Sequence, residues 1–353
     1  MRYLRFARND LVELASHMLI AGGLVHDKAA TVATLLIQTD EIGVTTHGIS
    51  LVPYYLPELK AGTMRSEGSY SIVRDGPAAM VWDGNYLPGH WLMVQALDVC
   101  MERARAYGLA CLAIRRSHHI GCLSVLTRIA AEKGFVCMIA TSDPSGRWVA
   151  PYGGREPIFT PDPWAIGYPG RDHPVLIDTC ASITTVSKVR EHINSGTQFE
   201  HAWLLDGHGY PTADPNVVSA DPKGSILLAG GMDHGHKGFA MALMVEMLTQ
   251  ALAGHGRADG PVQWGGNVFV QVMDPGAFCG QEAFVEQVEF LNAQCRASRP
   301  AAGFDQVRVP GDRAHACRKA AQDHGIRLPD EVWRRVSAYA DEMAIPLPAP
   351  MPS

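Results

Sequence analysis

The chain has 353 residues, of which 47% are hydrophobic and 19% charged, a balance typical of a globular protein with a large buried core. Its formal net charge of −6 and its scattered lysines and arginines argue against a nucleic-acid partner. No run approaches the roughly 20 continuous apolar residues of a membrane span, and the N-terminus lacks the apolar stretch of a signal peptide, so we expect no membrane partner.

Helical spacing of apolar residues dominates the first 60 residues. One helix is expected behind a cap at Asn9, and a second is expected from about Asp27 towards Glu41. A third helix is predicted from His47 to Lys60, with a glycine following its end.

From about residue 70 the pattern changes to short β-type runs that alternate with helical ones, which indicates an α/β domain. Strands are predicted at 71–73, 79–82, 109–114, 135–141, 175–178 and 267–273. Helices are predicted at 90–106, 122–134, 182–194, 237–252, 280–296, 312–324 and 329–343. Residues 195–235, rich in Gly, Pro, Asp and His, are expected to form a long irregular connection, and residues 346–353 a loose tail.

The eight cysteines occur singly, several of them within apolar runs, and no Cys-x-x-Cys pair is present. This usage is typical of buried, reduced thiols rather than of a disulfide framework or a zinc knuckle. We therefore expect a cytoplasmic protein.

Two short motifs contain histidines that are candidates for a catalytic role. Thr46-His47-Gly48 lies at the start of the third predicted helix, where Thr45 or Thr46 can act as the cap and Gly48 removes bulk beside the imidazole. A histidine in this position can face an open cleft with a pKa near neutrality, which suits proton transfer to a developing alkoxide or amine. An ordinary helix-cap histidine is the alternative.

The second motif, Ser117-His118-His119-Ile120-Gly121, lies between an apolar run and a helix, at a strand-to-helix turn of the kind where α/β proteins place ligand-binding groups. Two adjacent histidines cannot both face one way from an extended segment, so we expect His119 to point into the site, with Gly121 leaving room beside it. A metal centre that also uses His234 and His236 is the alternative, although no carboxylate accompanies them at ligand spacing.

The sequence of residues 230–238 nearly matches the Walker phosphate-binding motif. However, His236 separates Gly235 from Lys237, and Gly238 stands where a Ser or Thr would bind Mg²⁺, so a P-loop is rejected. Flexible glycines, a lysine and a helix N-terminus nevertheless make a good anion site, suited to a dinucleotide pyrophosphate or a ribose phosphate.

Taken together, these segments resemble the malate/L-lactate dehydrogenase-type NAD(P)-dependent oxidoreductases, a family distinct from the Rossmann-type lactate and malate dehydrogenases. The similarity runs from residues 40–48 to Val309-Pro310-Gly311-Asp312 and so covers nearly the whole chain. It implies a non-Rossmann α/β (α+β) fold, in which a mixed-sheet domain at 71–311 binds NADPH or NADH and a helical part at 1–70 packs with helices at 312–345. It also implies a homodimer whose active site lies between the domains, near the subunit interface.

The resemblance also implies roles for single residues. Thr46-His47-Gly48 is similar to a Ser-His-Gly motif whose histidine contacts substrate, and His119 matches a proposed proton donor or acceptor beside the nicotinamide. Cofactor contacts are implied for Ser117, Asp143, Asp178, Thr179, His236, Lys237, Gly311 and Asp312.

Departures from the family pattern concentrate around the expected substrate. Leu51 stands where the family usually has an arginine that grips the substrate carboxylate, and this removes the fork geometry that recognises a carboxylate. The family's Gly-Thr-Asn-Pro reads Thr160-Pro161-Asp162-Pro163, so an acid replaces an amide. We expect an atypical substrate, without a 2-carboxylate or with a positive charge, unless Arg147 or Arg155 replaces the missing arginine. The expected substrate contacts are Thr46, Leu51 and Asp162.

Three functions stay open at this point. The favoured one is an NAD(P)H-dependent reductase of a 2-keto acid, ketone or cyclic imine, with the nicotinamide supplying hydride and His119 or His47 the proton. The second is a repurposed member of the family with a non-redox or ligand-binding role, motivated by Leu51 and Asp162. The third is a metal-dependent lyase or hydrolase.

Overall fold

The computed structural model describes residues 3–352. Its helices are α1 (Arg8–Ala21), α2 (His26–Glu41), α3 (Val52–Ala61), α4 (Gly89–Tyr107), α5 (Leu123–Ala131), α6 (Val186–Ser195), α7 (Gly231–Glu246), α8 (Gln281–Ala297), α9 (Asp312–His324) and α10 (Asp330–Glu342). Its strands are β1 (Tyr3–Phe6), β2 (Ser71–Asp75), β3 (Ala79–Asp83), β4 (Leu109–Ser117), β5 (Val136–Ser142), β6 (Pro163–Tyr168), β7 (Val175–Cys180), β8 (Leu204–Leu205), β9 (Pro211–Thr212), β10 (Ser225–Ile226), β11 (Gly266–Met273) and β12 (Ile326–Pro329). Within this range, no helix combines the length and the apolar character needed to cross a bilayer.

A seven-stranded mixed sheet forms the centre of the molecule, with the strand order β2-β3-β4-β11-β5-β6-β7. β3 and β4 run parallel, whereas all other neighbours in this sheet run antiparallel. β11 comes from late in the chain and yet lies between β4 and β5, where Val270 pairs with both Leu112 and Ile139. One end of the sheet therefore collects the ends of β4, β5 and β7 and the starts of β6 and β11. We call it the His119 end, and the mixed sheet confirms the predicted non-Rossmann α/β fold class.

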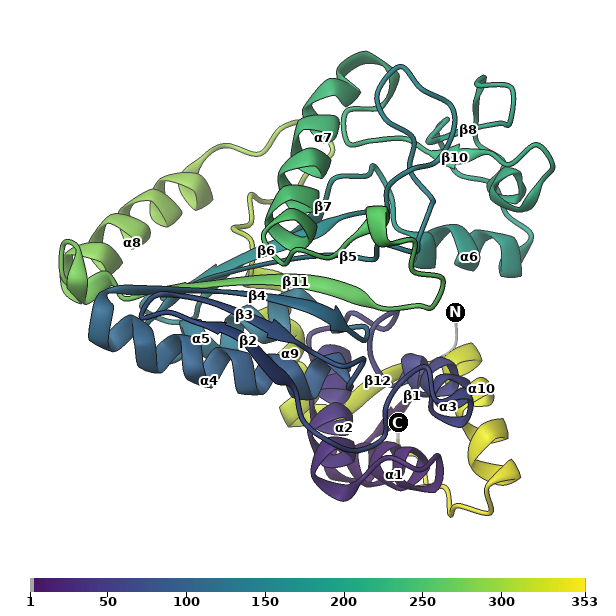
Figure 1. Cartoon of the computed structure of the whole chain (residues 1–353), viewed down its shortest axis with the longest axis horizontal. Coiled ribbons are helices and arrows are strands. Elements are labelled where there is room, and N and C mark those ends of the chain that lie inside the picture. The colour runs from purple at the N-terminus through teal and green to yellow at the C-terminus, as the bar shows by residue number, and fades with distance from the viewer. Residues whose placement is uncertain (1–2, 353) are drawn as a thin grey trace.

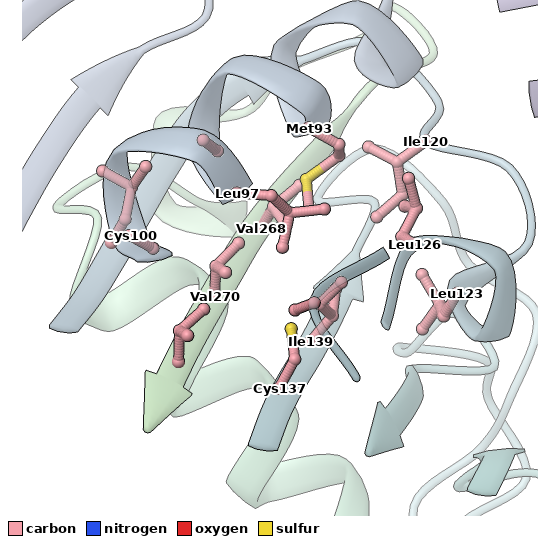
Figure 2. Packing of buried hydrophobic residues seen from close by; sticks show 14 of the residues in the cluster. Met93, Leu97, Cys100, Ile120, Leu123, Leu126, Cys137, Ile139, Val268 and Val270 are labelled. Carbon is pink, nitrogen blue, oxygen red and sulfur yellow. The ribbon is translucent and has the colours of Figure 1, made fainter. Parts of the chain in front are cut away.

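Helices cover both faces of this sheet. Figure 1 shows α4 and α5 against one face and α7 against the other. Apolar residues three and four apart on α4 meet alternate residues of the strands, because a helix and a strand present one face at these two spacings. Figure 2 shows this packing among fully buried side chains, which include Met93, Leu97 and Cys100 of α4, Cys137 and Ile139 of β5, and Val268 and Val270 of β11.

The two ends of the described chain come together in a helical unit beside the sheet. β1 pairs antiparallel with β12, and Leu4 lies opposite Leu328. The ring of Phe6 lies 4.2 Å from that of Trp333 in α10, and Phe6 is fully buried. Figure 1 shows these purple and yellow segments side by side below the sheet. A hydrophobic cluster of α1, α2, α3, β12 and α10 side chains holds the unit together.

The structure corrects the predicted start of three helices. α1 begins at Arg8 with Ala7 in the N-cap position, so Asn9 is not the cap. α3 begins at Val52 after a 3₁₀ turn, so residues 45–48 form a turn ahead of the helix rather than its first turn. α7 begins ahead of Lys237 at Gly231, whose positive φ of 60° lets the chain enter the helix from a tight turn.

Other differences concern strands and the tail. β6 was not predicted, because Pro163 and Gly167 are poor strand formers and hide its pattern. Residues 195–235 are largely irregular as predicted, but they contain β8, β9 and β10, which form a small three-stranded sheet. The predicted loose tail is anchored at Met351, whose N–H donates to the Arg5 carbonyl at 2.8 Å, while Ser353 lies outside the described residues.

Replacing Phe6 by alanine tests whether the chain ends hold the helical unit together. Because Phe6 is fully buried against Trp333, we expect Phe6→Ala to lower the free energy of unfolding by about 3–5 kcal/mol. Denaturant unfolding followed by tryptophan fluorescence measures the change. Ile72→Ala, in an exposed position of β2, serves as the control and should shift the free energy of unfolding by about 0.5 kcal/mol or less. Equal effects of the two substitutions would contradict the packing described.

Candidate active site

The His119 end of the sheet brings together residues that are far apart in the sequence. His119 lies in the turn after β4, and Trp264 lies just before the neighbouring strand β11. Asp143 follows β5, Asp162 precedes β6, and Asp178 lies near the end of β7. Polar groups gathered at strand ends are typical of a ligand-binding crevice in an α/β protein.

His119 is held by a residue of the helical unit. The Tyr55 hydroxyl lies 2.7 Å from His119 Nδ1, and Tyr55 itself is fully buried. The ring of His47 is stacked on that of His119 at a centroid distance of 5.9 Å, while Thr46 Oγ1 lies 2.9 Å from His47 Nδ1. Trp264 closes another side, with its ring 5.2 Å from that of His119. The two histidine motifs therefore meet at one place.

Burial keeps both of these histidines neutral. It lowers the pKa of His47 to about 4, so the expected pKa near neutrality is wrong. Burial also lowers the pKa of His119 well below its usual value, and repulsion from His47, His90 and His118 lowers it further. A neutral imidazole has a free ring nitrogen, so the resting site holds a group that can accept a proton.

Two further histidines lie behind the pair. His118 is fully buried, with its ring 4.9 Å from that of Trp264 and its Nε2 3.7 Å from the Glu58 carboxylate. His90, near the start of α4, is 2% exposed, and burial lowers the pKa of both His90 and His118 to about 3. His118 thus faces the core, whereas the adjacent His119 is partly exposed.

Gly48 and Gly121 were expected to leave room beside the rings of His47 and His119, but the structure shows other side chains against them. A Cβ on Gly48 would overlap the carboxyl group of Asp40, and a Cβ on Gly121 would overlap the ring of His90. Asp40 is 4% exposed, accepts the Ile49 N–H at 2.7 Å, and has its pKa raised to about 8 by burial. Glycine is therefore needed at position 48 because a buried acid packs against the turn that carries His47.

Leu51 does not line an open substrate pocket. It is 8% exposed and packs in the hydrophobic cluster of the helical unit. A guanidinium nevertheless reaches this turn, because Arg335 of α10 donates to the Ser50 carbonyl at 3.0 Å. Arg147 and Arg155, the replacements considered from the sequence, are both exposed.

Asp162 is fully buried, which contradicts the expected substrate contact, whereas Thr46 is exposed. Asp162 has a positive φ of 48°, and its Oδ1 accepts the Thr160 hydroxyl at 2.6 Å. Burial and the nearby Glu246 raise the pKa of Asp162 well above its usual value, and the one close cation, Arg257, is 2.7 Å from Glu246. Asp162 is therefore an acid within the protein interior rather than a surface group that attracts a cationic substrate.

The predicted cofactor residues at the His119 end differ in access. Asp178 and Thr179 are exposed, and Asp178 Oδ2 accepts the Ser124 N–H at 2.8 Å at the start of α5. Asp143 is half-buried and accepts hydrogen bonds within its own turn. Ser117 is fully buried, and its hydroxyl donates to the next residue's carbonyl at 2.7 Å, so it offers no free surface to a cofactor.

The remaining predicted cofactor residues lie on α7 and at the start of α9. His236 and Lys237 are exposed near the start of α7. Gly311 and Asp312 lie at the start of α9, close to the first residues of β7 and therefore at the opposite end of the sheet from His119. The start of α7 lies near the His119 end of β7, since a Cβ on Gly238 would lie 2.7 Å from the Ala181 carbonyl, so only Gly311 and Asp312 are placed at the far end of the sheet.

The alternative metal centre is not assembled. Among residues 3–352, no group of three or more His, Cys, Asp and Glu side chains is placed to hold a metal ion. His234 and His236 lie near each other on α7, at a ring distance of 6.1 Å, whereas His119 is bonded to Tyr55.

Several residues of the site carried no signal in the sequence. Tyr55, Trp264 and Glu58 reach the histidines only because α3 and the segment before β11 fold against the end of β4. Their spacing in the chain predicts an ordinary amphipathic helix and a loop, so sequence periodicity could not single them out.

Comparison with known proteins places these observations in a family. The family model described as malate/L-lactate dehydrogenase matches residues 6–337. The chain is 28% identical to the L-sulfolactate dehydrogenase of Methanothermobacter thermautotrophicus over 98% of each chain. It is 27% identical to the ureidoglycolate dehydrogenase (NAD(+)) of Escherichia coli over 94% of each chain.

A solved structure shows the same likeness in three dimensions. The Δ1-piperideine-2-carboxylate reductase of Pseudomonas syringae superposes with a TM-score of 0.83 at 26% identity, over 95% of this chain and 99% of that one. The relatives are named for the oxidation or reduction of different small molecules, so their names agree on the class of reaction and differ in the substrate.

The buried carboxyl group of Asp162 predicts a pH-dependent stability. Because its pKa is raised in the folded state, the native protein keeps a proton that the unfolded chain releases, and the free energy of unfolding falls as the pH rises. We expect Asp162→Asn to be more stable than the wild type at pH 8, by about 1–3 kcal/mol, and this gap to shrink at pH 5. Urea unfolding at both values measures it, with the exposed Asp305→Asn as the control. A gap that does not change with pH would contradict the raised pKa.

Proposed function

This chain belongs to the malate/L-lactate dehydrogenase family, and from that membership we propose that it transfers a hydride between a nicotinamide cofactor and a small-molecule C=O or C=N bond. The observation that supports the proposal most directly is the contact between the His47 and His119 rings, held by Tyr55 at the end of the sheet. Relatives named for hydroxy acids and for a cyclic imine support both kinds of bond. The burial of Leu51 supports an atypical substrate, since the turn after His47 offers no guanidinium of its own.

The exposed groups on β7 and α7 fit a nucleotide. Asp178 and Thr179 offer a carboxylate and a hydroxyl to ribose hydroxyls, and Lys237 offers a positive charge to phosphate near a helix N-terminus. We therefore propose NADH or NADPH as the cofactor. When bound, the nicotinamide supplies or accepts the hydride.

His119 moves the proton in this proposal. Burial keeps the Tyr55 hydroxyl protonated by raising its pKa. In the tautomer that the proposal requires, His119 Nδ1–H donates to the Tyr55 oxygen, and Nε2 keeps a lone pair that faces the substrate. In the oxidation direction, neutral His119 accepts the substrate proton at Nε2, and in the reduction direction it returns the proton from the same atom. His47, stacked beside it, raises the cost of a second charge and keeps the proton on one ring at a time.

We also propose how the chain divides into domains and in which compartment of the cell it works. Separate hydrophobic clusters support a helical part of residues 1–70 with 312–345 and a sheet domain of residues 71–311, with the site between them. Eight unpaired thiols, several of them buried, support a cytoplasmic location, where thiols stay reduced.

A homodimer is proposed from the surface of α8. Among its residues only Asn292 is buried, while Phe290 and Leu291 are 66% and 62% exposed. An exposed apolar helix face of this kind is typical of a subunit interface. Light scattering should give twice the chain mass, and we expect Phe290→Glu with Leu291→Glu to give a monomer, while Gln287→Glu on the same helix leaves the dimer intact. A wild-type monomer would refute the proposal.

Substitutions at His119 and Tyr55 test the proton transfer. With an identified keto acid, ketone or cyclic imine as substrate, we expect His119→Gln to lower kcat by about 10²–10⁴-fold. Tyr55→Phe should lower kcat by about tenfold and shift the pH profile, because the ring loses its partner at Nδ1. Tyr54→Phe is the matched control. Full turnover in His119→Gln would exclude the assigned role.

Measurements of nucleotide binding and of hydride transfer distinguish the proposed redox function from a non-redox role. Titration with NADH and with NADPH, followed by nicotinamide fluorescence, should show saturable binding of at least one of them. Binding without hydride transfer to any of a broad panel of carbonyl and imine substrates would favour a ligand-binding role. Binding of neither nucleotide would refute the redox proposal.

A further inference from the structure

A buried acid that the proposed mechanism does not use lies beneath the turn that carries His47. Asp40, near the end of α2, is 4% exposed, and its Oδ2 accepts the Ile49 N–H at 2.7 Å. Its Oδ1 is also buried and has no hydrogen-bond partner among residues 3–352. An ionised carboxylate here would lack donors for most of its lone pairs, whereas an uncharged carboxyl group loses much less by burial.

The bond from Ile49 fixes the chain on the far side of His47. Ahead of His47, backbone bonds close the turn, since the Val44 N–H donates to the Thr39 carbonyl at 3.1 Å and the His47 N–H to the Val44 carbonyl at 3.2 Å. Beyond His47, Ile49 is fully buried, and its N–H donates to the side chain of Asp40. Loss of this acceptor would leave a buried donor unpaired, so the closed turn depends on Asp40.

Gly48 brings the backbone next to His47 into direct contact with the same acid. A Cβ on Gly48 would overlap the carboxyl group of Asp40, so nothing separates the two. The His47 ring in turn stacks on that of His119 at a centroid distance of 5.9 Å. A change in the size or charge of the Asp40 carboxyl group is therefore passed through the backbone to the His47 ring.

The surroundings of Asp40 favour its uncharged form. Burial raises the pKa of Asp40 to about 8, while the bond from Ile49 opposes this shift and the charge of Glu41 adds to it. His47 supplies no charge, because burial lowers its pKa to about 4. The cations of the neighbouring helices are paired with other groups: Arg8 with Glu41 at 2.9 Å, Arg128 with Gln38 at 2.9 Å, Arg318 with Glu132 at 2.6 Å, and Arg335 with the Ser50 carbonyl at 3.0 Å.

We propose that Asp40 is a positioning residue for His47: its uncharged carboxyl group holds the turn closed, and loss of its proton to solvent opens the turn. An open turn gives water access to the carboxylate, and water stabilises the charge that the closed turn excludes. Opening is thus coupled to the release of one proton. The consequence for catalysis rests on the proposed function, whereas the opening itself can be measured without turnover.

The turn should open more often as the pH rises. The pKa of Asp40 is about 8 in the closed turn, and in a hydrated turn it returns to its ordinary value of about 4. Between these two values the open state releases a proton that the closed state keeps. The population of open turns therefore rises by up to about tenfold per pH unit and levels off above pH 8.

Hydrogen–deuterium exchange of the full chain measures this opening. The peptide that contains Ile49 is followed by mass spectrometry at pH 6, 7 and 8, and its exchange rate is divided by that of an unstructured peptide at the same pH. For the wild type we expect the protection of this segment to fall by about three- to tenfold per pH unit. Asp40→Asn keeps an acceptor for the Ile49 N–H but has no proton to lose, so its protection should stay constant.

The matched control is Asp27→Asn. It removes a carboxylate that is 63% exposed from the first turn of the same helix, α2, and should keep the pH dependence of the wild type. If Asp40→Asn does not fold, the wild-type profile decides alone, in comparison with the buried segment of α4 that contains Leu97. Protection that falls with pH near Ile49 and stays constant near Leu97 supports the inference.

Chemical modification tests whether His47 moves with the turn. Diethyl pyrocarbonate reacts with the unprotonated imidazole, and an imidazole is mostly unprotonated at both pH 7 and pH 8, so a change in rate between them reports access. We expect His47, identified by peptide mapping, to react several-fold faster at pH 8 than at pH 7 in the wild type. In Asp40→Asn the two rates should be nearly equal.

Three results would overturn the inference: a flat exchange profile in the wild type, equal pH slopes in the wild type and Asp40→Asn, or a turn that opens while the modification rate of His47 stays constant. Failure of the proposed function gives a different result. It is shown by the absence of NADH and NADPH binding, which leaves the exchange profiles unaffected. Constant exchange in a protein that does transfer hydride would refute the role of Asp40 alone.

Discussion

The hydrogen bond between Tyr55 and His119 is the contact on which the proposed chemistry depends, because it joins two separately packed parts of the chain. Tyr55 belongs to a helix whose apolar residues pack within the helical unit, whereas His119 lies in the turn that follows β4 of the central sheet. Neither part orients the imidazole without the other. A displacement of the helical unit against the sheet would therefore weaken the bond at Nδ1 of His119, because hydrogen bonds depend on distance and direction.

Burial controls the electrostatics around this contact. Four histidines and a tyrosine gather where little water reaches, and their ring–ring distances lie between 4.9 and 6.1 Å wherever Tyr55 or Trp264 takes part. Charging one imidazole raises the cost of charging the next, so the cluster holds protons one at a time. Burial lowers the pKa of the histidines but raises the pKa of the two buried acids, Asp40 and Asp162, because in both cases it favours the uncharged form. The four histidines and these two acids consequently favour their neutral forms although all of them are ionisable.

Much of the architecture could be predicted from sequence, because long periodic segments such as those of β4, α4 and β11 carry strong signals. Both histidine motifs were also recognisable, since each combines a small residue, an imidazole and a glycine at an element boundary. The roles of their neighbours were not recognisable. Gly48 and Gly121 were expected to clear space beside the catalytic rings, whereas they accommodate Asp40 and His90, which lie close only in the folded chain. Asp162 reads as a polar loop residue and is buried, because its acidic side chain turns inward from a left-handed backbone conformation. Such contacts depend on tertiary packing, which no local pattern encodes.

The pairing of β1 with β12 has a consequence for how the protein is made. Residues 3–6 leave the ribosome long before their partners at 326–329 are synthesised. Until then Phe6 and its neighbours have no strand to cover them, and the turn with His47 lacks its final support from α10. The sheet can assemble during translation once β11 has emerged, whereas the helical unit must wait for the last helix. The newborn chain thus carries exposed apolar surface until β12 and α10 have emerged, the condition under which chaperones are recruited.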